Sequence, residues 1–224
     1  MSAVVLPHCV HAPRSAATSV TRTVGVVLVL WLALIFILGS QDRFVTSPGT
    51  PPLALLLAVT LPIVVFLVTY RVSERIRAFV LDLDLRLAMG IQAWRFAGLG
   101  FLALYTHHVL PGVFAWPAGL GDIAIGVSAP WLLVALIRNP ALAASRGFVA
   151  WNLFGLLDLA VAVGIGTLVA SVGIGTTDGT TTGVMSKLPL LLVPGFLVPV
   201  FVMLHIATLL QARRLAGAVH SHSP

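Results

Sequence analysis

The sequence predicts an all-α integral membrane protein, a bundle of six transmembrane helices with both termini on the cytoplasmic side. The first observation is composition, since 58% of the 224 residues are hydrophobic and only 9% are charged. Soluble domains carry roughly a quarter charged residues, so charge is too scarce here to cover a soluble surface. The second observation is a set of six long apolar stretches, and the third is the alternation of basic residues between them.

Each apolar stretch is close to the roughly twenty residues that a helix needs to cross a hydrocarbon core about 30 Å thick. We place the spans at about 24–40, 52–70, 87–109, 118–137, 148–172 and 188–210, within a membrane domain of residues 24–212. Residues 1–23 are expected to form a disordered cytoplasmic tail, and residues 213–224 a second cytoplasmic tail.

The first stretch is short enough to resemble a cleaved signal peptide. Leu38 occupies a position where a cleavage site needs a small residue, and the preceding tail is long. We therefore expect a retained helix.

Basic residues predict the orientation. Only Arg43 and Lys187 fall in one set of loops, and Arg95 falls inside a span. The other ten lie in the tails and in the alternate loops: Arg14, Arg22, Arg71, Arg75, Arg77, Arg86, Arg138, Arg146, Arg213 and Arg214. Cytoplasmic loops are enriched in Lys and Arg, so the side with ten basic residues is predicted to be cytoplasmic.

Segment 71–86 allows two interpretations, because it mixes charged residues with regularly spaced apolar ones. It forms either a short helix at the cytoplasmic interface or the extended ends of the second and third spans.

Several classes of function are disfavoured. The formal net charge of +6 comes from residues at the ends of spans, so we expect no nucleic-acid partner. The single cysteine, Cys9, excludes an intramolecular disulfide. Its neighbours His8 and His11 could also bind a metal, but three such residues in a tail expected to be disordered are weak evidence for a metal site. No nucleophile–base pair or phosphate-binding loop is evident, so an enzyme is disfavoured and we expect no cofactor.

The informative residues are polar side chains inside the spans, because a charged group at the centre of a bilayer helix costs roughly 2.5–3.5 kcal/mol. Such residues face the bundle interior and find partners there. The candidate cluster has six members: Gln92, Arg95, Asp122, Asn152, Asp158 and His205.

Spacing and depth suggest how the cluster assembles. Gln92 and Arg95 share one helix face, as do Asn152 and Asp158, because both pairs follow a spacing of three residues or a multiple of three. Similar depth favours an Arg95–Asp158 ion pair, with Arg95–Asp122 as the alternative.

A series of motifs in the C-terminal 60% of the chain resembles an uncharacterised family of small bacterial multipass membrane proteins. These motifs are Gln92-Ala93-Trp94-Arg95, Leu110-Pro111, Gly121-Asp122-Ile123, Gly126, Ala129-Pro130, Trp151-Asn152, Pro194, Val198-Pro199 and His205. The resemblance implies a fold and a site but no assigned activity. We expect the protein to lie in the plasma (inner) membrane of a bacterium. Other members carry an apolar residue or Asn where this chain has Asp158, which favours Asp122 as the partner of Arg95.

The cluster can be functional or structural. The first hypothesis is a transporter or channel for a small polar solute or protons, in which Arg95 attracts an anion or His205 exchanges protons. The alternatives are a non-catalytic sensor or assembly subunit and, less favoured, a haem or redox protein. The oligomeric state is left open.

Overall fold

A computed structural model describes residues 14–47, 49–173 and 180–220. Within these residues the chain is helical and contains no strand. Six helices are long and apolar enough to cross a membrane: Ser19–Ser40, Leu53–Val72, Leu85–Thr106, Gly112–Arg138, Arg146–Val172 and Val193–Gly217. The predicted all-α, six-span membrane fold is therefore confirmed.

The spans contain the following elements. The first two are α1 (Arg14–Ser40) and α2 (Leu53–Val72), followed by the short α3 (Glu74–Leu81). The third span joins α4 (Leu85–Gln92), the 3₁₀ segment η1 (Ala93–Gly98) and α5 (Leu99–Thr106). Next come α6 (Gly112–Arg138), η2 (Pro140–Ala144), α7 (Arg146–Val172) and η3 (Thr182–Ser186). The last span joins the π-helical η4 (Val193–Leu197) to α8 (Val198–His220).

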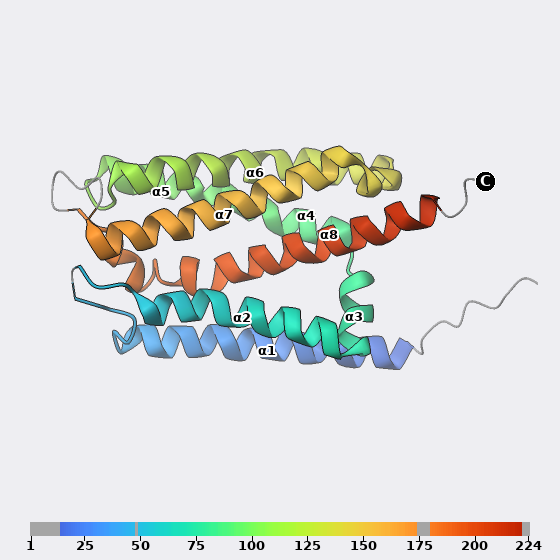
Figure 1. Ribbon diagram of the computed structural model, residues 1–224, viewed down its shortest axis with the longest axis horizontal. Helices are drawn as coiled ribbons and strands as arrows, with labels where there is room; N and C mark the ends of the chain where they lie inside the picture. The colour runs from blue at the N-terminus through green and yellow to red at the C-terminus, as the bar shows by residue number, and fades with distance from the viewer. Residues whose placement is uncertain (1–13, 48, 174–179, 221–224) are drawn as a thin grey trace, which may run out of the picture.

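The long helices run roughly along one axis, as Figure 1 shows. Helices α1 and α2 form one side of the bundle, α5, α6 and α7 form the other, and α8 lies between them. The first residues of α1 and the last residues of α8 lie at the same end of the bundle, as an even number of spans requires.

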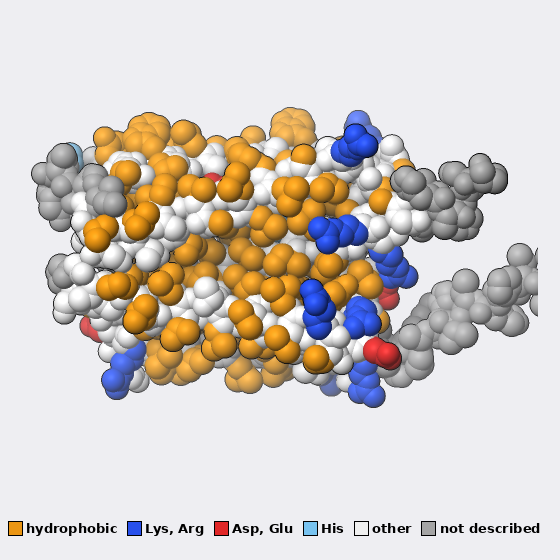
Figure 2. All heavy atoms as spheres, in the orientation of Figure 1, with side chains coloured by type: hydrophobic (Ala, Val, Ile, Leu, Met, Phe, Trp, Pro, Cys, Tyr) orange, Lys and Arg blue, Asp and Glu red, His pale blue; other side chains and the backbone are white. Residues whose placement is uncertain are grey.

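The surface is that of a lipid-facing bundle. Figure 2 shows hydrophobic side chains covering the flank, while most basic side chains gather at the end where α1 begins and α8 ends. Leu30, Leu57 and Leu157 are each more than 60% exposed in the isolated chain. Soluble monomers rarely expose a continuous apolar surface of this extent, which supports the membrane assignment.

Helix α3 resolves the two interpretations of segment 71–86, because it is a separate helix that lies across the Arg-rich end of the bundle (Figure 1). Ser73 caps its first turn by accepting a hydrogen bond from the Ile76 amide. At its other end, Nε2 of Gln211 donates to the carbonyls of Val80 and Leu83 at 2.8 and 2.9 Å. These bonds fasten α3 to α8.

Several helix boundaries differ from the expected ones. The last span begins at Val193 rather than at residue 188. Helix α6 begins at Gly112 rather than near residue 118, because the chain turns into the helix directly after Pro111 at the N-cap position and Pro117 lies within the helix. Helix α1 begins at Arg14, inside the expected tail 1–23, and α8 continues to His220, inside the expected tail 213–224. Residues 1–13, which include His8, Cys9 and His11, lie outside the described residues.

Candidate functional site

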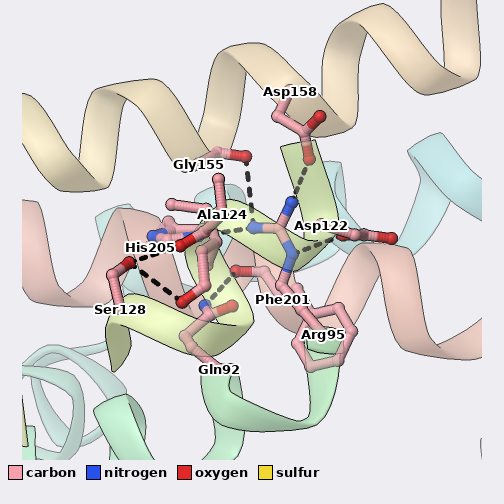
Figure 3. Close-up of polar contacts among 10 residues, drawn as sticks. Gln92, Arg95, Asp122, Ala124, Ser128, Gly155, Asp158, Phe201 and His205 are labelled. Carbon is pink, nitrogen blue, oxygen red and sulfur yellow. Dashed lines mark hydrogen bonds and ion pairs between the residues drawn. The ribbon is translucent and has the colours of Figure 1, made fainter. Parts of the chain in front are cut away.

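Six polar residues from four spans meet inside the bundle, and Figure 3 labels five of them, all except Asn152. Gln92 and Arg95 come from the third span, Asp122 from α6 and His205 from α8. Asn152 and Asp158 lie on the same face of α7, as their spacing predicts. Five of the six are buried, and the Asp122 side chain keeps 16% of its surface exposed.

Arg95 pairs with both candidate carboxylates at once. Its Nε donates to Oδ1 of Asp122 at 2.6 Å, and its Nη2 donates to Oδ2 of Asp158. The guanidinium fork presents separate donors in one plane, which lets it bridge carboxylates on two helices. The two pairings that the sequence offered as alternatives therefore coexist.

The depth of Asp122 explains why it reaches Arg95. Because α6 begins at Gly112, Asp122 lies ten residues into the helix, about 15 Å from its start. A helix that began near residue 118 would place the carboxylate only about 6 Å from the helix start. The earlier start brings it level with Arg95.

The second half of the network surrounds His205. Nη1 of Arg95 lies 3.1 Å from Nε2 of the imidazole, and Nδ1 lies 2.9 Å from Oδ1 of Asn152. Arginine only donates, so Nε2 accepts and the hydrogen of a neutral ring lies on Nδ1. The Asn152 amide nitrogen donates to the Phe148 carbonyl, which leaves its oxygen as the acceptor for His205 and Thr208.

Glycines let the helices approach at the cluster. A Cβ on Gly155 would overlap the His205 ring, and a Cβ on Gly121 would overlap the Asp158 carboxylate. Further along α6, a Cβ on Gly126 would overlap the backbone of Arg95 and Phe96. Small residues at membrane helix crossings allow this close packing, and here they bring polar side chains within hydrogen-bonding distance.

Arg95 belongs to η1, a 3₁₀ segment in the middle of the third span. A run of 3₁₀ helix inside a longer helix has weaker hydrogen-bond geometry and is common at hinges and strained positions. Gly98 and Gly119 hold this segment against α6, because a Cβ on Gly119 would lie 3.1 Å from the Gly98 carbonyl oxygen. The cluster therefore lies at an irregular part of the helix.

The formal charges of the cluster do not cancel. One arginine faces two carboxylates, and His205 is neutral when Nε2 accepts from Arg95. An uncompensated charge inside a bundle is expensive, and a proton on one carboxylate or an additional cation would balance the charge of the cluster.

A cavity of about 120 Å³ extends from the end opposite the Arg-rich end towards the cluster. Its walls are largely apolar and include Leu56, Val59, Phe101 and Phe114. Asp122 also lines this cavity, so the exposed part of its side chain belongs to the ion-paired group.

Hydroxyl groups line the outer part of the cavity. Thr46 and Ser47 follow α1, while Thr182 and Ser186 belong to η3. The Thr182 hydroxyl donates to the Gly166 carbonyl at 2.6 Å, which holds η3 against α7. The cavity thus has polar groups at its outer end, apolar walls and a carboxylate at its inner end.

Gln92 has an unsatisfied acceptor. Its Nε2 donates to the Phe201 carbonyl at 3.2 Å, but its buried Oε1 has no hydrogen-bond partner. Leaving such an atom unpaired costs roughly 1–3 kcal/mol. The cluster is therefore not fully satisfied at this position.

Sequence reasoning missed Thr208, Gln211 and the Ser128–Trp151 pair. Thr208 donates to Asn152 at 2.6 Å, and Trp151 Nε1 donates to the Ser128 hydroxyl at 2.8 Å. His205, Thr208 and Gln211 follow one another at intervals of three along α8, and this spacing could have identified the stripe.

Metal or haem ligation by His205 is disfavoured by its contacts, because both ring nitrogens already face protein groups. Among the residues that the structure describes, no group of three His, Cys, Asp or Glu side chains could hold a metal ion.

Comparison with known proteins gives a family and no activity. No curated protein and no solved structure matches this chain. Residues 52–213 match a family described as "Domain of unknown function (DUF8737)", and they include α2 to α7, the part of α8 up to Arg213 and all six cluster residues. The match covers most of the chain, which shows that the protein is a member of this family of unknown function.

Proposed function

We propose that the protein is a carrier for a small polar solute or for protons, and that the Arg95 cluster is its binding and gating site. The observation that supports this most directly is the cavity that ends at Asp122, a carboxylate ion-paired with buried Arg95. Ionisable residues inside membrane spans are costly, and they commonly mark substrate or proton pathways.

A carrier fits the arrangement better than an open pore. Gln92, Asn152 and His205 have no exposed surface, and they lie in the bundle beside the ion pairs. A solute in the cavity therefore meets a closed, hydrogen-bonded layer. Passage requires this layer to rearrange, which is the behaviour of a carrier that alternates its access.

The proposed orientation places the Arg-rich end in the cytoplasm of a bacterial cell and the cavity on the outer side of the plasma membrane. The excess of Arg at the end that holds both termini supports this orientation. The cavity then receives its solute from outside the cell.

Proton flux is the first activity to test. The purified protein in sealed vesicles, with a pH-sensitive dye inside and an imposed membrane potential, is expected to carry protons faster than empty vesicles. Asp122→Asn is expected to reduce this flux at least tenfold, since it removes the carboxylate at the end of the cavity.

A matched control is Asp82→Asn. This carboxylate lies 3.6 Å from Arg214 at the exposed Arg-rich end, and its side chain is 75% exposed. The control should keep wild-type flux. Equal fluxes from Asp122→Asn and Asp82→Asn would refute the proposed role of Asp122.

A structural role is the second candidate, because Arg95 has a partner for each of its three nitrogens. A paired cluster of this kind can hold helices in register within a non-catalytic membrane subunit. In that case vesicles would show no flux of protons or solutes, and Asp122→Asn would change only the unfolding temperature in detergent.

A further inference from the structure

The chemistry of the cavity identifies a class of ligand more closely than the cluster alone. Asp122 is the charged residue that lines it, and the described lining contains no Lys, Arg or His. An anionic ligand would face the Asp122 carboxylate and would find no basic side chain in the described lining to pair with. The lining therefore favours a neutral or positively charged ligand.

Aromatic rings add to this preference. Phe101 and Phe114 both line the cavity, with ring centroids 5.5 Å apart in an edge-to-face arrangement. Faces of aromatic rings attract organic cations, and quaternary ammonium groups are recognised by such rings. Helix α5 supplies one ring and α6 the other, so the rings lie on the two spans that carry Arg95 and Asp122.

The carboxylate has room for a second partner. Arg95 contacts Oδ1 of Asp122, and Figure 3 shows the other carboxylate oxygen pointing away from the guanidinium. Around Asp122, the charged and titratable groups are Arg95 from η1, which contacts it directly, and the two other partners of Arg95. These are Asp158 from α7 and His205 from α8. Because one arginine faces two carboxylates, one additional positive charge would balance the cluster.

The size and polarity of the cavity limit the ligand further. A volume of about 120 Å³ is slightly smaller than the cavity of roughly 150 Å³ that holds benzene. An inorganic cation needs several oxygen ligands around it, whereas these walls are mainly carbon. A compact organic cation with about five or six heavy atoms fits both the charge and the walls.

We propose that the cavity is a binding site for a small organic ammonium cation, whose charge replaces a proton on the Asp122–Asp158 carboxylate pair. This assignment rests on the proposed carrier function and names its substrate class. When the cation enters, the displaced proton leaves to the outer solution through the same cavity. Cation and proton thus compete for one site, which couples their movements in opposite directions.

Tetramethylammonium is the appropriate probe because its charge does not change with pH. Binding to the detergent-purified protein is measured by titration calorimetry, beside tert-butanol as a neutral molecule of similar shape, pivalate as an anion and sodium chloride. We expect tetramethylammonium to bind at least tenfold more tightly than tert-butanol, and we expect no binding of pivalate or sodium.

Proton release gives a test that needs no variant. Cation binding is expected to release protons, seen as a dependence of the measured heat on the ionisation enthalpy of the buffer. Affinity is expected to fall as the solution becomes more acidic, because protons then occupy the carboxylate pair. Equal affinity for tert-butanol and tetramethylammonium, or binding of sodium alone, would overturn the assignment.

Two substitutions locate the site. Asp122→Asn should weaken tetramethylammonium binding at least tenfold, and Phe114→Leu should weaken it about threefold, because the ring is lost while apolar volume is largely kept. Asp82→Asn should bind as the wild type does. Unchanged affinity in a folded Asp122→Asn protein would contradict the proposed site.

The binding and flux measurements test the ligand assignment and the carrier function independently. Binding of tetramethylammonium without any flux in vesicles would retain the site and refute the carrier. Proton or solute flux without binding of the probe would retain the carrier and refute the ammonium ligand.

Discussion

The imidazole of His205 faces the guanidinium of Arg95, with Nε2 of the ring 3.1 Å from Nη1 of the arginine. The contact is buried, and it requires the ring to accept a hydrogen bond from a cation. The ring also connects Arg95 to Asn152 through Nδ1. His205 is therefore the link between the ion pairs and the neutral half of the network.

Replacing His205 by leucine should destabilise the protein by about 1–3 kcal/mol, because a donor of Arg95 loses its buried acceptor. His205→Gln should cost less, since its amide can still accept from Arg95 and donate to Asn152. Unfolding in detergent, followed by tryptophan fluorescence, gives the comparison. Equal stability of the two variants would mean that the hydrogen bonds contribute little.

Charge counting predicts unequal effects of neutralising Arg95 and Asp158. Arg95→Met leaves two carboxylates without their cation and should cost about 3–5 kcal/mol. Asp158→Asn leaves Arg95 matched with Asp122 and retains an acceptor, so it should cost less than about 1.5 kcal/mol. Denaturation of both variants in the same detergent tests the order, and the reverse order would contradict the charge count.

The contact of Gly155 with His205 gives a packing prediction. A Cβ at Gly155 would overlap the imidazole, so Gly155→Ala should cost about 1–3 kcal/mol. Gly164 lies on the same helix with no atom within 4 Å of its added Cβ, and Gly164→Ala should be neutral or stabilising by up to about 1 kcal/mol. A similar loss of stability in both variants would show that the contact with His205 does not govern the effect of Gly155→Ala.

The unsatisfied oxygen of Gln92 predicts a substitution that does not harm stability. Gln92→Met keeps much of the side-chain volume and removes the unpaired acceptor, so stability should stay the same or rise by about 1 kcal/mol. The same variant should be assayed for flux in vesicles. A loss of more than about 2 kcal/mol would indicate that Oε1 has a partner, such as a bound water.

The orientation can be tested with cysteines at the two ends. Gln41 and Arg75 are exposed at opposite ends of the bundle, and Cys9 is the single natural cysteine. In a Cys9→Ser background, a membrane-impermeant maleimide added to intact cells should label Gln41→Cys and not Arg75→Cys. Permeabilised cells should label both, and the opposite pattern in intact cells would invert the proposed orientation.

The sequence predicted the spans and the cluster because both have a large energetic signature. An apolar stretch of twenty residues has few alternatives, and residues such as Arg95 and Asp158 must find partners inside the bundle. The joint pairing of Arg95 was not predictable, because it depends on the start of α6 at Gly112 and hence on the depth of Asp122.

Other features carry weaker signals. Thr208 went unnoticed because a threonine can bond to its own helix backbone and is therefore common in membrane spans. The 3₁₀ segment that contains Arg95 has no proline from which it could be predicted, and it packs closely against Gly126 of α6. The cavity arises from side chains on several spans, so no local pattern could reveal it.

The helical geometry of η1 determines how α5 is rotated relative to α4. A 3₁₀ helix turns about 120° per residue and an α-helix about 100°, so rewinding the six residues of η1 as α-helix would rotate α5 against α4 by about 120°. The same change would shorten the segment by about 3 Å, from the difference in rise per residue. Phe101 lies beyond this segment and Gln92 before it, so such a rewinding at the buried arginine would displace Phe101 in the cavity wall relative to Gln92.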